Sequence, residues 1–330
     1  MGLRPWFAFF LRARSVAFLV RFDIGGRRYR CGPRPPKSVP SAPVAETGWE
    51  DLDVRADPSR PGRFTTQVSD PWMLVVVPQG GIVAAIAARA MAAALDDPSQ
   101  TLRTLSCVFA GQVSAGPVEV DVQVLRRGRS MSQMTATVRN AGADAGLTAI
   151  AAFGAPRRGF DFTELAMPDV PGPEECRGWR DGLPEGVELE LTRPPMAFWE
   201  RVVESRSAIG RFPWDPFTEG PAERVYWYRM DEPPLQADGR VDPLAALVLC
   251  DTMPGAVDQK LGWADEPWFG PSVDLTVQLF GAPRPGWLLA HNRARFAGDG
   301  YASVEMALWD PADRSLVAYA TQLMFFAFGI

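Results

Sequence analysis

The sequence predicts an α+β protein made of two consecutive units, each an antiparallel sheet wrapped around one central helix. Two observations lead to this prediction. An alanine-rich helix followed directly by several short strands occurs in the first half of the chain, and the order strand, helix, strands occurs again in the second half. With 330 residues, the chain is long enough for both units to bury a core.

The first unit is expected over residues 46–155. Pro78-Gln79-Gly80-Gly81 opens an apolar, alanine-rich run at residues 82–95, which predicts a helix packed closely on all sides. Alternation of apolar and polar residues between Gly- and Asn-containing turns predicts strands at 63–69, 101–110, 116–128, 130–141 and 146–155. We expect these strands to form one curved sheet over the helix.

The second unit is expected over residues 193–330, with a central helix that begins at Asp242. Its strands are predicted at 196–208, 223–232, 271–280, 286–297, 301–311 and 315–328. The stretch VFAGQVSAG corresponds to QLFGAPRPG, and RRGRSMSQMTATV corresponds to FAGDGYASVEMAL, at about the same offset. This register indicates an internal duplication. Because each unit alone would expose a sheet edge, we expect the two units to pair as a pseudo-dimer.

Two further segments complete the chain. Residues 1–45 contain two short apolar runs split by Arg12 and Arg14, followed by a basic, proline-rich tail. Neither run reaches the roughly 20 residues that a membrane-spanning helix needs. We therefore predict a disordered extension with no transmembrane segment, and a membrane-surface anchor is the weaker alternative. Residues 156–192 are rich in Pro and Gly and are predicted to be a linker along the surface of both units.

Composition excludes several classes of function. The net charge of −5 argues against nucleic-acid binding, which usually requires a basic surface. The four cysteines stand far apart without a CxxC pair, so we expect no zinc site and no disulfide framework, and a cytoplasmic location fits this pattern. His291 is the single histidine and lies in a strand-like run, which leaves the usual histidine-based catalytic relays and metal sites without ligands.

The helix that begins at Asp242 carries an acid where its pattern calls for an apolar residue. Asp242 is a good N-cap and Pro243 suits the first helical position. An apolar stripe then leads to Asp251, and Pro254-Gly255 should end or bend the helix. A carboxylate on the buried side of such a helix is costly unless it has partners or a chemical role. The alternative is a helix-end aspartate that turns to solvent.

Two other polar residues stand out in the same half of the chain. Gln322 is the one polar residue on a strand face that it shares with two alanines, a methionine and a phenylalanine. Ser272 begins a strand, with Thr276 as its substitute on the same face if the register shifts. Backbone hydrogen bonding and turn closure are the structural alternatives for these two. The first unit does not offer the full set: Thr101 matches Ser272, but Arg89 and Ala151 stand at the positions equivalent to Asp251 and Gln322.

These features resemble the TesB-type (type II) acyl-CoA thioesterases, which are two tandem hotdog domains, over roughly residues 46–330. In that family an Asp on the C-terminal central helix, a Ser or Thr at the start of the next strand and a Gln on the last strand form the active site. The resemblance assigns these roles to Asp251, to Ser272 in Ser272-Val273-Asp274-Leu275-Thr276, and to Gln322 in Val317-Ala318-Tyr319-Ala320-Thr321-Gln322. Both family histidines are missing from the strand at residues 274–280.

The expected chemistry is hydrolysis of acyl-CoA to a free fatty acid and CoA. Asp251 would act as general base on a water that Ser272 and Gln322 orient. Backbone N–H groups near a central-helix N-terminus, at Gly80 and Gly81, would hold the oxyanion. The acyl chain would lie in an apolar slot, for which the candidate lining residues are Trp72, Met73, Phe325 and Phe326.

No metal or redox cofactor is expected, because coenzyme A enters as part of the substrate. A non-catalytic acyl- or CoA-binding hotdog protein of lipid or polyketide metabolism is the alternative function. A hotdog dehydratase or hydratase is disfavoured, because those enzymes use a catalytic histidine and His291 is on a different element. We expect the chain to self-associate further, as a dimer of double hotdogs or a larger homo-oligomer.

Overall fold

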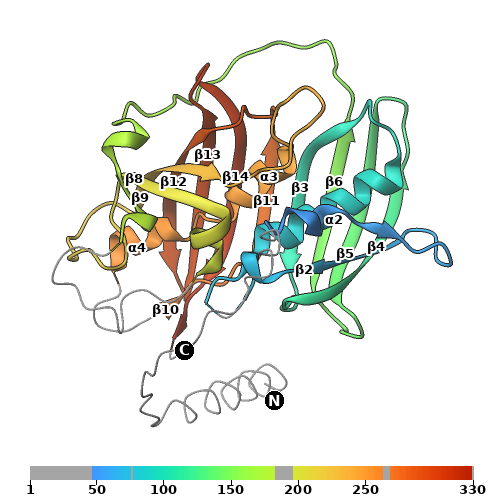
Figure 1. The fold of residues 1–330 in the computed structure, drawn as a ribbon, viewed down its shortest axis with the longest axis horizontal. Coiled ribbons are helices and arrows are strands. Elements are labelled where there is room, and N and C mark those ends of the chain that lie inside the picture. The colour runs from blue at the N-terminus through green and yellow to red at the C-terminus, as the bar shows by residue number, and fades with distance from the viewer. Residues whose placement is uncertain (1–46, 76, 183–195, 263–267, 329–330) are drawn as a thin grey trace, which may run out of the picture. The chain divides into compact units, whose positions relative to one another are not determined.

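The computed structural model describes residues 47–75, 77–182, 196–262 and 268–328, and the predicted extension at residues 1–45 lies outside these ranges. Figure 1 shows two helix-and-sheet halves side by side. The N-terminal half contains η1 (Trp49–Leu52), β1 (Arg55–Ala56), β2 (Arg63–Val68), η2 (Asp70–Trp72), α2 (Gly80–Leu95), β3 (Thr101–Phe109), β4 (Gly116–Arg126), β5 (Met131–Asn140) and β6 (Leu147–Gly154). Each strand predicted for this half is confirmed, within one or two residues at its ends.

The C-terminal half repeats the order of strand, helix and strands. It contains η5 (Phe198–Val202), β8 (Val203–Ile209), β9 (Glu223–Met230), α3 (Pro243–Cys250), α4 (Gly255–Leu261), β10 (Trp268–Phe269), β11 (Asp274–Leu279), β12 (Trp287–Gly298), β13 (Tyr301–Asp310), β14 (Ser315–Phe325) and β15 (Ala327–Phe328). The expected central helix is therefore two helices, and the chain between them runs from Asp251 to Pro254 without helical structure.

One continuous sheet of 13 strands joins the halves, in the order β1-β2-β4-β5-β6-β3-β11-β14-β13-β12-β9-β8-β7, where β7 is Arg177–Gly178. The segments β2-β4-β5-β6-β3 and β9-β12-β13-β14-β11 mirror each other across the seam between β3 and β11. That seam is antiparallel, with Asp274 opposite Val108 and Gln278 opposite Thr104. Pairing at the seam covers the edge that each half would otherwise expose, as the duplication predicted.

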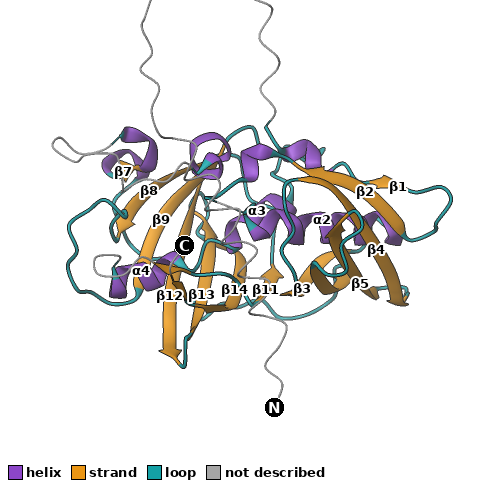
Figure 2. Ribbon diagram, turned by 90° about the horizontal axis from the view of Figure 1, so that it is seen from below, coloured by secondary structure: helices purple, strands orange, loops and turns teal. Residues whose placement is uncertain are grey.

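The sheet curves around α2 and α3, which lie side by side on its concave side (Figure 2). Alanines at 0–1% exposure fill most of α2, so the helix packs closely against its surroundings, as expected for its composition. Each of the two helices begins in contact with the other. The N-cap of α2, Gln79, donates from Nε2 to the carbonyl of Val248 at 2.8 Å, and the N-cap of α3, Asp242, pairs with Arg89 of α2.

Two predicted segments differ from the structure. Residues 196–208 were expected to form one strand, but Phe198–Val202 is a wide π-helical turn and the strand β8 starts only at Val203. The turn places Phe198 in the core with no exposed surface, where its ring packs 4.7 Å from that of Trp199 and its N–H bonds to the carbonyl of Met73. Packing of the aromatic rings therefore overrides the local strand pattern.

The second difference is the linker at residues 156–192. It contains η3 (Pro173–Glu175), β7 and η4 (Trp179–Asp181), and β7 extends the sheet by pairing with β8. Met167, Val170 and Cys176 of this segment pack on the outer face of the C-terminal half, against Trp227 and Trp309 among others.

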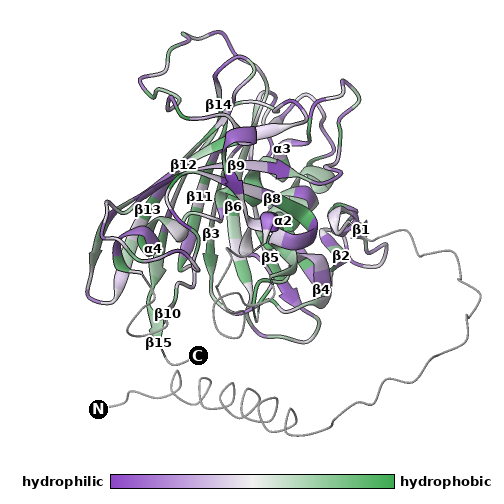
Figure 3. Cartoon of the chain, turned by 60° about the vertical axis from the view of Figure 1, so that its left-hand side comes forward, coloured by the Kyte–Doolittle hydropathy of each residue, from purple (hydrophilic) through white to green (hydrophobic). Residues whose placement is uncertain are grey.

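The strands mix hydrophobic and hydrophilic positions along their length (Figure 3), as expected where the two faces have different surroundings.

Candidate active site

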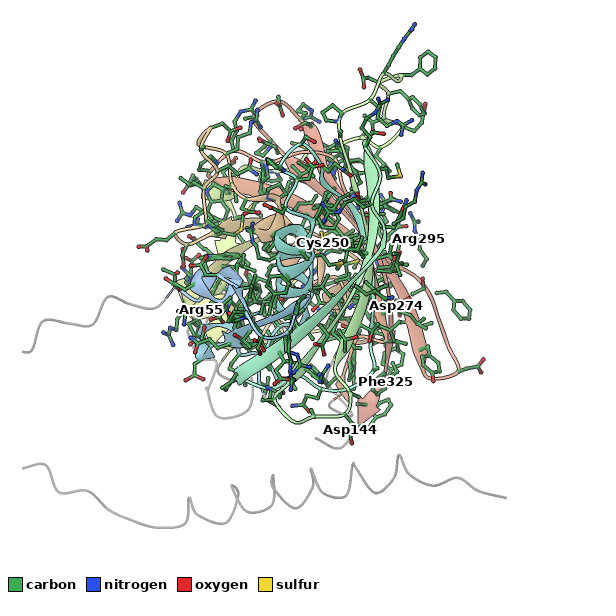
Figure 4. All side chains as sticks on the ribbon, turned by 90° about the vertical axis from the view of Figure 1, so that its right-hand side faces the viewer. Arg55, Asp144, Cys250, Asp274, Arg295 and Phe325 are labelled. Atoms are coloured by element: carbon green, nitrogen blue, oxygen red, sulfur yellow. The ribbon has the colours of Figure 1, made fainter. Side chains whose placement is uncertain are left out.

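Asp251 is the C-cap of α3 and the first residue of the turn that leads to α4. Its backbone φ of −87° and ψ of 28° leave the helical range, so the side chain departs from the apolar stripe of the helix. The carboxylate is only partly accessible and does not turn out to open solvent. In Figure 4 its neighbour Cys250 lies in the helical layer, while Asp274 and Phe325 lie on the sheet.

The structure brings the three predicted catalytic residues into one hydrogen-bonded cluster. Gln322 Nε2 donates to Asp251 Oδ1 at 2.6 Å, and Ser272 Oγ donates to the same oxygen at 3.2 Å. Gln322 Nε2 also donates to Ser272 Oγ. Gln322 belongs to β14, and Ser272 is held just before β11 by a bridge to Met324 of β14. Thr276, the alternative to Ser272, bonds instead to Ser106 across the seam.

The N-terminus of α2 closes the other side of the cluster. The backbone amides of Gly81 and Gly80 hydrogen-bond to the Asp251 carboxylate. A Cβ atom at Gly80 would lie 2.8 Å from Asp251 Oδ2, and one at Gly81 would lie 2.6 Å from the carbonyl oxygen of Val248. Glycine at both positions therefore allows the start of α2 to touch the end of α3. A carboxylate at the positive end of a helix dipole is also electrostatically favoured.

The surroundings of Asp251 bring its titration close to neutral pH. Burial is the largest influence and raises the pKa of Asp251 to about 6. Hydrogen bonds from Gln322 and Ser272, and then from the Gly81 and Gly80 amides, act in the opposite direction because they favour the ionised form. A group with this pKa is ionised at pH 7 and can still accept a proton, as a general base must.

Two cysteines close to Asp251 are poor alternatives as reactive groups. Burial raises the pKa of the Cys107 and Cys250 thiols well above the usual range, and the nearby Asp251 charge raises it further. Since the thiolate is the nucleophilic form, both side chains remain inert thiols at neutral pH. Asp251 is thus the titratable group of this cluster that can exchange a proton near pH 7.

One polar atom of the cluster has no partner in the described part of the chain. Gln322 is 3% exposed, and its Oε1 is buried without a hydrogen bond there. A buried acceptor of this kind is costly unless a water or ligand satisfies it. Gln322 therefore has a free acceptor within the same side chain that donates to Asp251.

The predicted substrate-binding residues fall into two groups. Gly80 and Gly81 lie directly at the cluster, although their amides hold the Asp251 carboxylate and not a separate oxyanion. Trp72 is fully buried, with its Nε1 bonded to the carbonyl of Gly48 at 3.0 Å and its ring 4.8 Å from that of Trp49. Its surroundings are those of a core residue. The remaining candidates are Met73, Phe325 and Phe326.

Met73 is partly buried and lies in the loop before α2. Phe325 ends β14 and Phe326 follows it, three and four positions after Gln322. Both are partly buried, and Phe326 packs edge-on against Trp268 at 5.0 Å. Phe325 donates its N–H to the carbonyl of Pro271, next to Ser272. The two phenylalanines therefore lie closer to the cluster along the chain than Trp72 does.

His291 lies away from this cluster, on the outer face of β12, where it contacts Glu223 and Arg293. Alternation along β12 places Leu289, His291 and Arg293 on that face, and Asp251 lies on the concave side. Among the described residues, no group of three or more His, Cys, Asp or Glu side chains could hold a metal ion. Over the same part of the chain, the structure contains no helix that is both long and apolar enough to cross a membrane.

Sequence reasoning missed two neighbours of the cluster. Gln79 caps α2, with Oε1 accepting from Ile82 N at 3.1 Å, and links it to α3. Its position directly before Gly80-Gly81 and a helical run was a usable signal for an N-cap. Phe109 would contact a Cβ atom at Gly80 at 2.7 Å. The sequence carries no signal for this contact, because it arises only when β3 and α2 pack together.

Comparisons with known proteins agree with this architecture. The chain matches the acyl-CoA thioesterase N-terminal domain over residues 68–154 and the acyl-CoA thioesterase C-terminal domain over residues 173–326. A comparison with curated proteins gave no match.

Solved structures show the same fold at low sequence identity. A hotdog-fold protein of unknown function from Alicyclobacillus acidocaldarius is 24% identical, with a TM-score of 0.66 over 87% of this chain and 100% of its own. A putative thioesterase II from Thermobifida fusca is 22% identical, with a TM-score of 0.66 over 84% and 98%. An acyl-CoA thioesterase II from Mycobacterium marinum is 19% identical, with a TM-score of 0.63 over 85% and 98%. With both of its domains matched, the chain belongs to the acyl-CoA thioesterase family and has the TesB-like double-hotdog fold.

Proposed function

We propose that this protein hydrolyses acyl-CoA thioesters to a free fatty acid and CoA, with Asp251 as the general base. The observation that carries the proposal is the cluster in which Ser272 and Gln322 both hydrogen-bond to one oxygen of Asp251. A buried carboxylate with a near-neutral pKa suits proton transfer from water. The division into domains at residues 46–155 and 193–330 is part of the same proposal.

Water is the nucleophile in this mechanism. One hydrogen of the water points to the Asp251 carboxylate, and the second is accepted by Gln322 Oε1, the buried acceptor without a partner in the described residues. These two contacts aim the oxygen lone pair at the thioester carbonyl carbon. Asp251 takes the proton as the C–O bond forms, which produces a tetrahedral intermediate with a negatively charged oxygen.

Collapse of the intermediate breaks the C–S bond. Asp251 returns its proton to the departing sulfur, so that the products are the free acid and the CoA thiol and the base is regenerated. The N-terminus of α2 faces this cluster, and the positive end of its dipole favours the negative charge that develops on the carbonyl oxygen. The Gly80 and Gly81 amides also keep Asp251 oriented throughout the cycle.

The test is release of free thiol from acyl-CoAs of different chain lengths, with the wild type beside Asp251→Asn. We expect turnover by the wild type on at least one chain length and a loss of about 100-fold or more in kcat for the variant, as is typical for a general base. A variant as active as the wild type would refute the role of Asp251. If the wild type binds acyl-CoA but shows no turnover on any chain length, the protein is the non-catalytic binding protein that the sequence leaves as the alternative.

A further inference from the structure

In the turn that carries Asp251 the backbone bonds span three residues: the N–H of Asp251 donates to the carbonyl of Val248 at 3.3 Å, and that of Thr252 donates to the carbonyl of Leu249 at 3.2 Å. Residues Asp251–Pro254 lie between the end of α3 and the start of α4 and adopt turn conformations. A catalytic base has to be held within a fraction of an ångström of its working position. Contacts from outside the turn add to these backbone bonds in fixing the position of Asp251.

Arg224 of β9 supplies such a contact from the sheet below. Its guanidinium donates to the backbone carbonyl of Thr252, the residue after Asp251, and to the Tyr228 hydroxyl at 3.2 Å. The same guanidinium lies over the ring of Tyr226, 4.6 Å from its centroid. Arg224 is 9% exposed, so this contact is inside the protein.

The charge of Arg224 is not matched by an acid. Within the described parts of the chain, no carboxylate lies within 4.0 Å of its guanidinium nitrogens, and its contacts are to neutral groups. Burying a cation without a counter-ion costs several kcal/mol. The partial negative charge at the C-terminal end of α3, to which the carbonyl of Thr252 is adjacent, offsets part of that cost. The energetic cost of burying this guanidinium indicates that its contact with Thr252 has a specific role.

The turn is shaped closely around the guanidinium. A Cβ atom at Gly255 would lie 2.0 Å from Arg224 Nη1, so a side chain at this position would displace the guanidinium. Thr252 Oγ1 donates to the carbonyl of Leu249 at 2.8 Å and is hydrogen-bonded to the Tyr228 hydroxyl at 3.2 Å. Thr252, inside the turn, is thus tied to α3, to Tyr228 and to Arg224.

We propose that Arg224 is a positioning residue for Asp251: by holding the carbonyl of Thr252, it keeps the carboxylate aligned with Ser272 and Gln322. The effect of Arg224 on turnover rests on the proposed thioesterase function. Its effect on the position of the Asp251 carboxylate does not require that the protein is a thioesterase. Arg224 does not touch the reacting atoms, so its removal should lower kcat and leave the KM for acyl-CoA nearly unchanged.

The test compares Arg224→Met, which keeps most of the side-chain volume, with Arg224→Lys and with Arg127→Met. Arg127 is the matched control, because it likewise donates to helix C-terminal carbonyls, those of Leu95 and Ala94 of α2, in the other half of the chain. Each variant is assayed for thiol release well below its melting temperature. Its crystal structure then gives the distance from Asp251 Oδ1 to Gln322 Nε2, which is 2.6 Å in the unaltered chain.

We expect Arg224→Met to lower kcat by about 10- to 100-fold with a change in KM below about threefold, the scale of a misplaced catalytic group. Arg224→Lys should recover part of kcat, because an ammonium can still donate to the carbonyl of Thr252. Arg127→Met should lower only the melting temperature. Tyr228→Phe, which removes one hydroxyl, serves as a milder variant if Arg224→Met does not fold.

Two outcomes would overturn the proposal. One is a folded Arg224→Met protein in which the Asp251 carboxylate stays within hydrogen-bond distance of both Gln322 and Ser272. The other is a kcat that falls no further than that of Arg127→Met. If the wild type has no thioesterase activity, the proposed function fails, and the crystallographic distance alone decides whether Arg224 positions Asp251.

Discussion

The two contacts between α2 and α3 differ in backbone and in charge, because α3 ends just before Asp251 whereas α2 continues past Arg89 to Leu95. At one end the start of α2 meets Asp251 at the end of α3, and at the other the start of α3 meets Arg89 of α2. Asp251 is bonded to neutral donors from Gln322, Ser272 and two amides, whereas Asp242 is paired with a cation. In the duplicated scaffold, helix length and side-chain chemistry together distinguish the proposed proton acceptor from a structural ion pair.

The strands beside the two ends also differ in whether they supply a polar side chain. Gln322 on β14 corresponds to Ala151 on β6, which is 3% exposed and carries no polar group. Asp242 is paired with the Arg89 guanidinium, whereas Asp251 has no cationic partner among the described residues. A carboxylate held by neutral donors in a buried site is closer to its point of titration. The difference explains why only one end is proposed as catalytic.

Replacing Gln322, whose amide has no counterpart at the Asp242 end, should have the largest effect on kcat. Gln322→Leu removes the donor to Asp251 and Ser272 and the free Oε1 acceptor, so we expect kcat for thiol release to fall by about 100-fold. The control is Thr321→Val, next in sequence and exposed on the opposite face of β14, which should keep wild-type kcat. Equal activity of the two variants would place Gln322 outside the site.

The ionised Asp251 should also lower the stability of the fold. Its pKa is raised from 3.8 to about 6, so the folded state binds the proton more tightly than the unfolded state does. The stabilisation from the protonated form is therefore complete below pH 4 and is lost as the pH rises through 6. We expect Asp251→Asn to raise the free energy of unfolding by about 3 kcal/mol at pH 8, from about 1.4 kcal/mol per unit of pKa.

Urea unfolding at pH 8 and at pH 3.5 measures this effect, because the gain should disappear at the lower pH. Asp242→Asn is the matched control, since it removes an acid from the ion-paired end and should not stabilise the protein at pH 8. A gain of equal size for Asp251→Asn at both pH values would show that its cause is not the ionisation of Asp251.

The pH dependence of turnover should follow the same carboxylate. Since a general base works only when ionised, kcat/KM should be constant above pH 7 and fall about tenfold per pH unit below the pKa of about 6. Rates of thiol release between pH 4.5 and 8.5 measure this limb of the profile. A flat profile down to pH 5 would remove Asp251 as the base.

The smallest effect is expected at the ion-paired end. Asp242→Ala removes the helix N-cap bond to Leu244 N, which is 2.9 Å long, and the pair with Arg89. We expect the free energy of unfolding to fall by about 1 kcal/mol, with kcat within twofold of the wild type. Thermal unfolding and the thiol-release assay decide this. A large loss of kcat would mean that the two ends are coupled and do not act independently.

Much of the fold could be predicted because local patterns and tertiary structure agree. The strands from Thr101 to Gly154 alternate in polarity and sit between clear turn residues, and the structure has them all. Asp242-Pro243 was a reliable helix start, and the side chain of Asp242 accepts from Leu244 N as an N-cap does. The duplication then predicted that the two units pair and cover their sheet edges, but not which strands meet.

The rest depends on contacts between distant segments. The pattern at Phe198–Val202 fits a strand, but the aromatic core that surrounds Phe198 imposes a π-helical turn. The expected helix after Asp242 stops at Cys250, four residues before Pro254, where Arg224 holds the carbonyl of Thr252. The contact of Gly81 with Val248 also has no local signature, because it exists only between two helices more than 150 residues apart in the chain.

The seam between β3 and β11 has a consequence for synthesis of the chain on the ribosome. Ser106 and Thr276 lie opposite each other in the seam, so β3 is made long before its partner strand leaves the exit tunnel. Until then the N-terminal half presents β3 as an open strand edge, which is a template for wrong pairing. Nascent chains that stall before β11 should therefore aggregate or bind chaperones, and completion of β11 should release them.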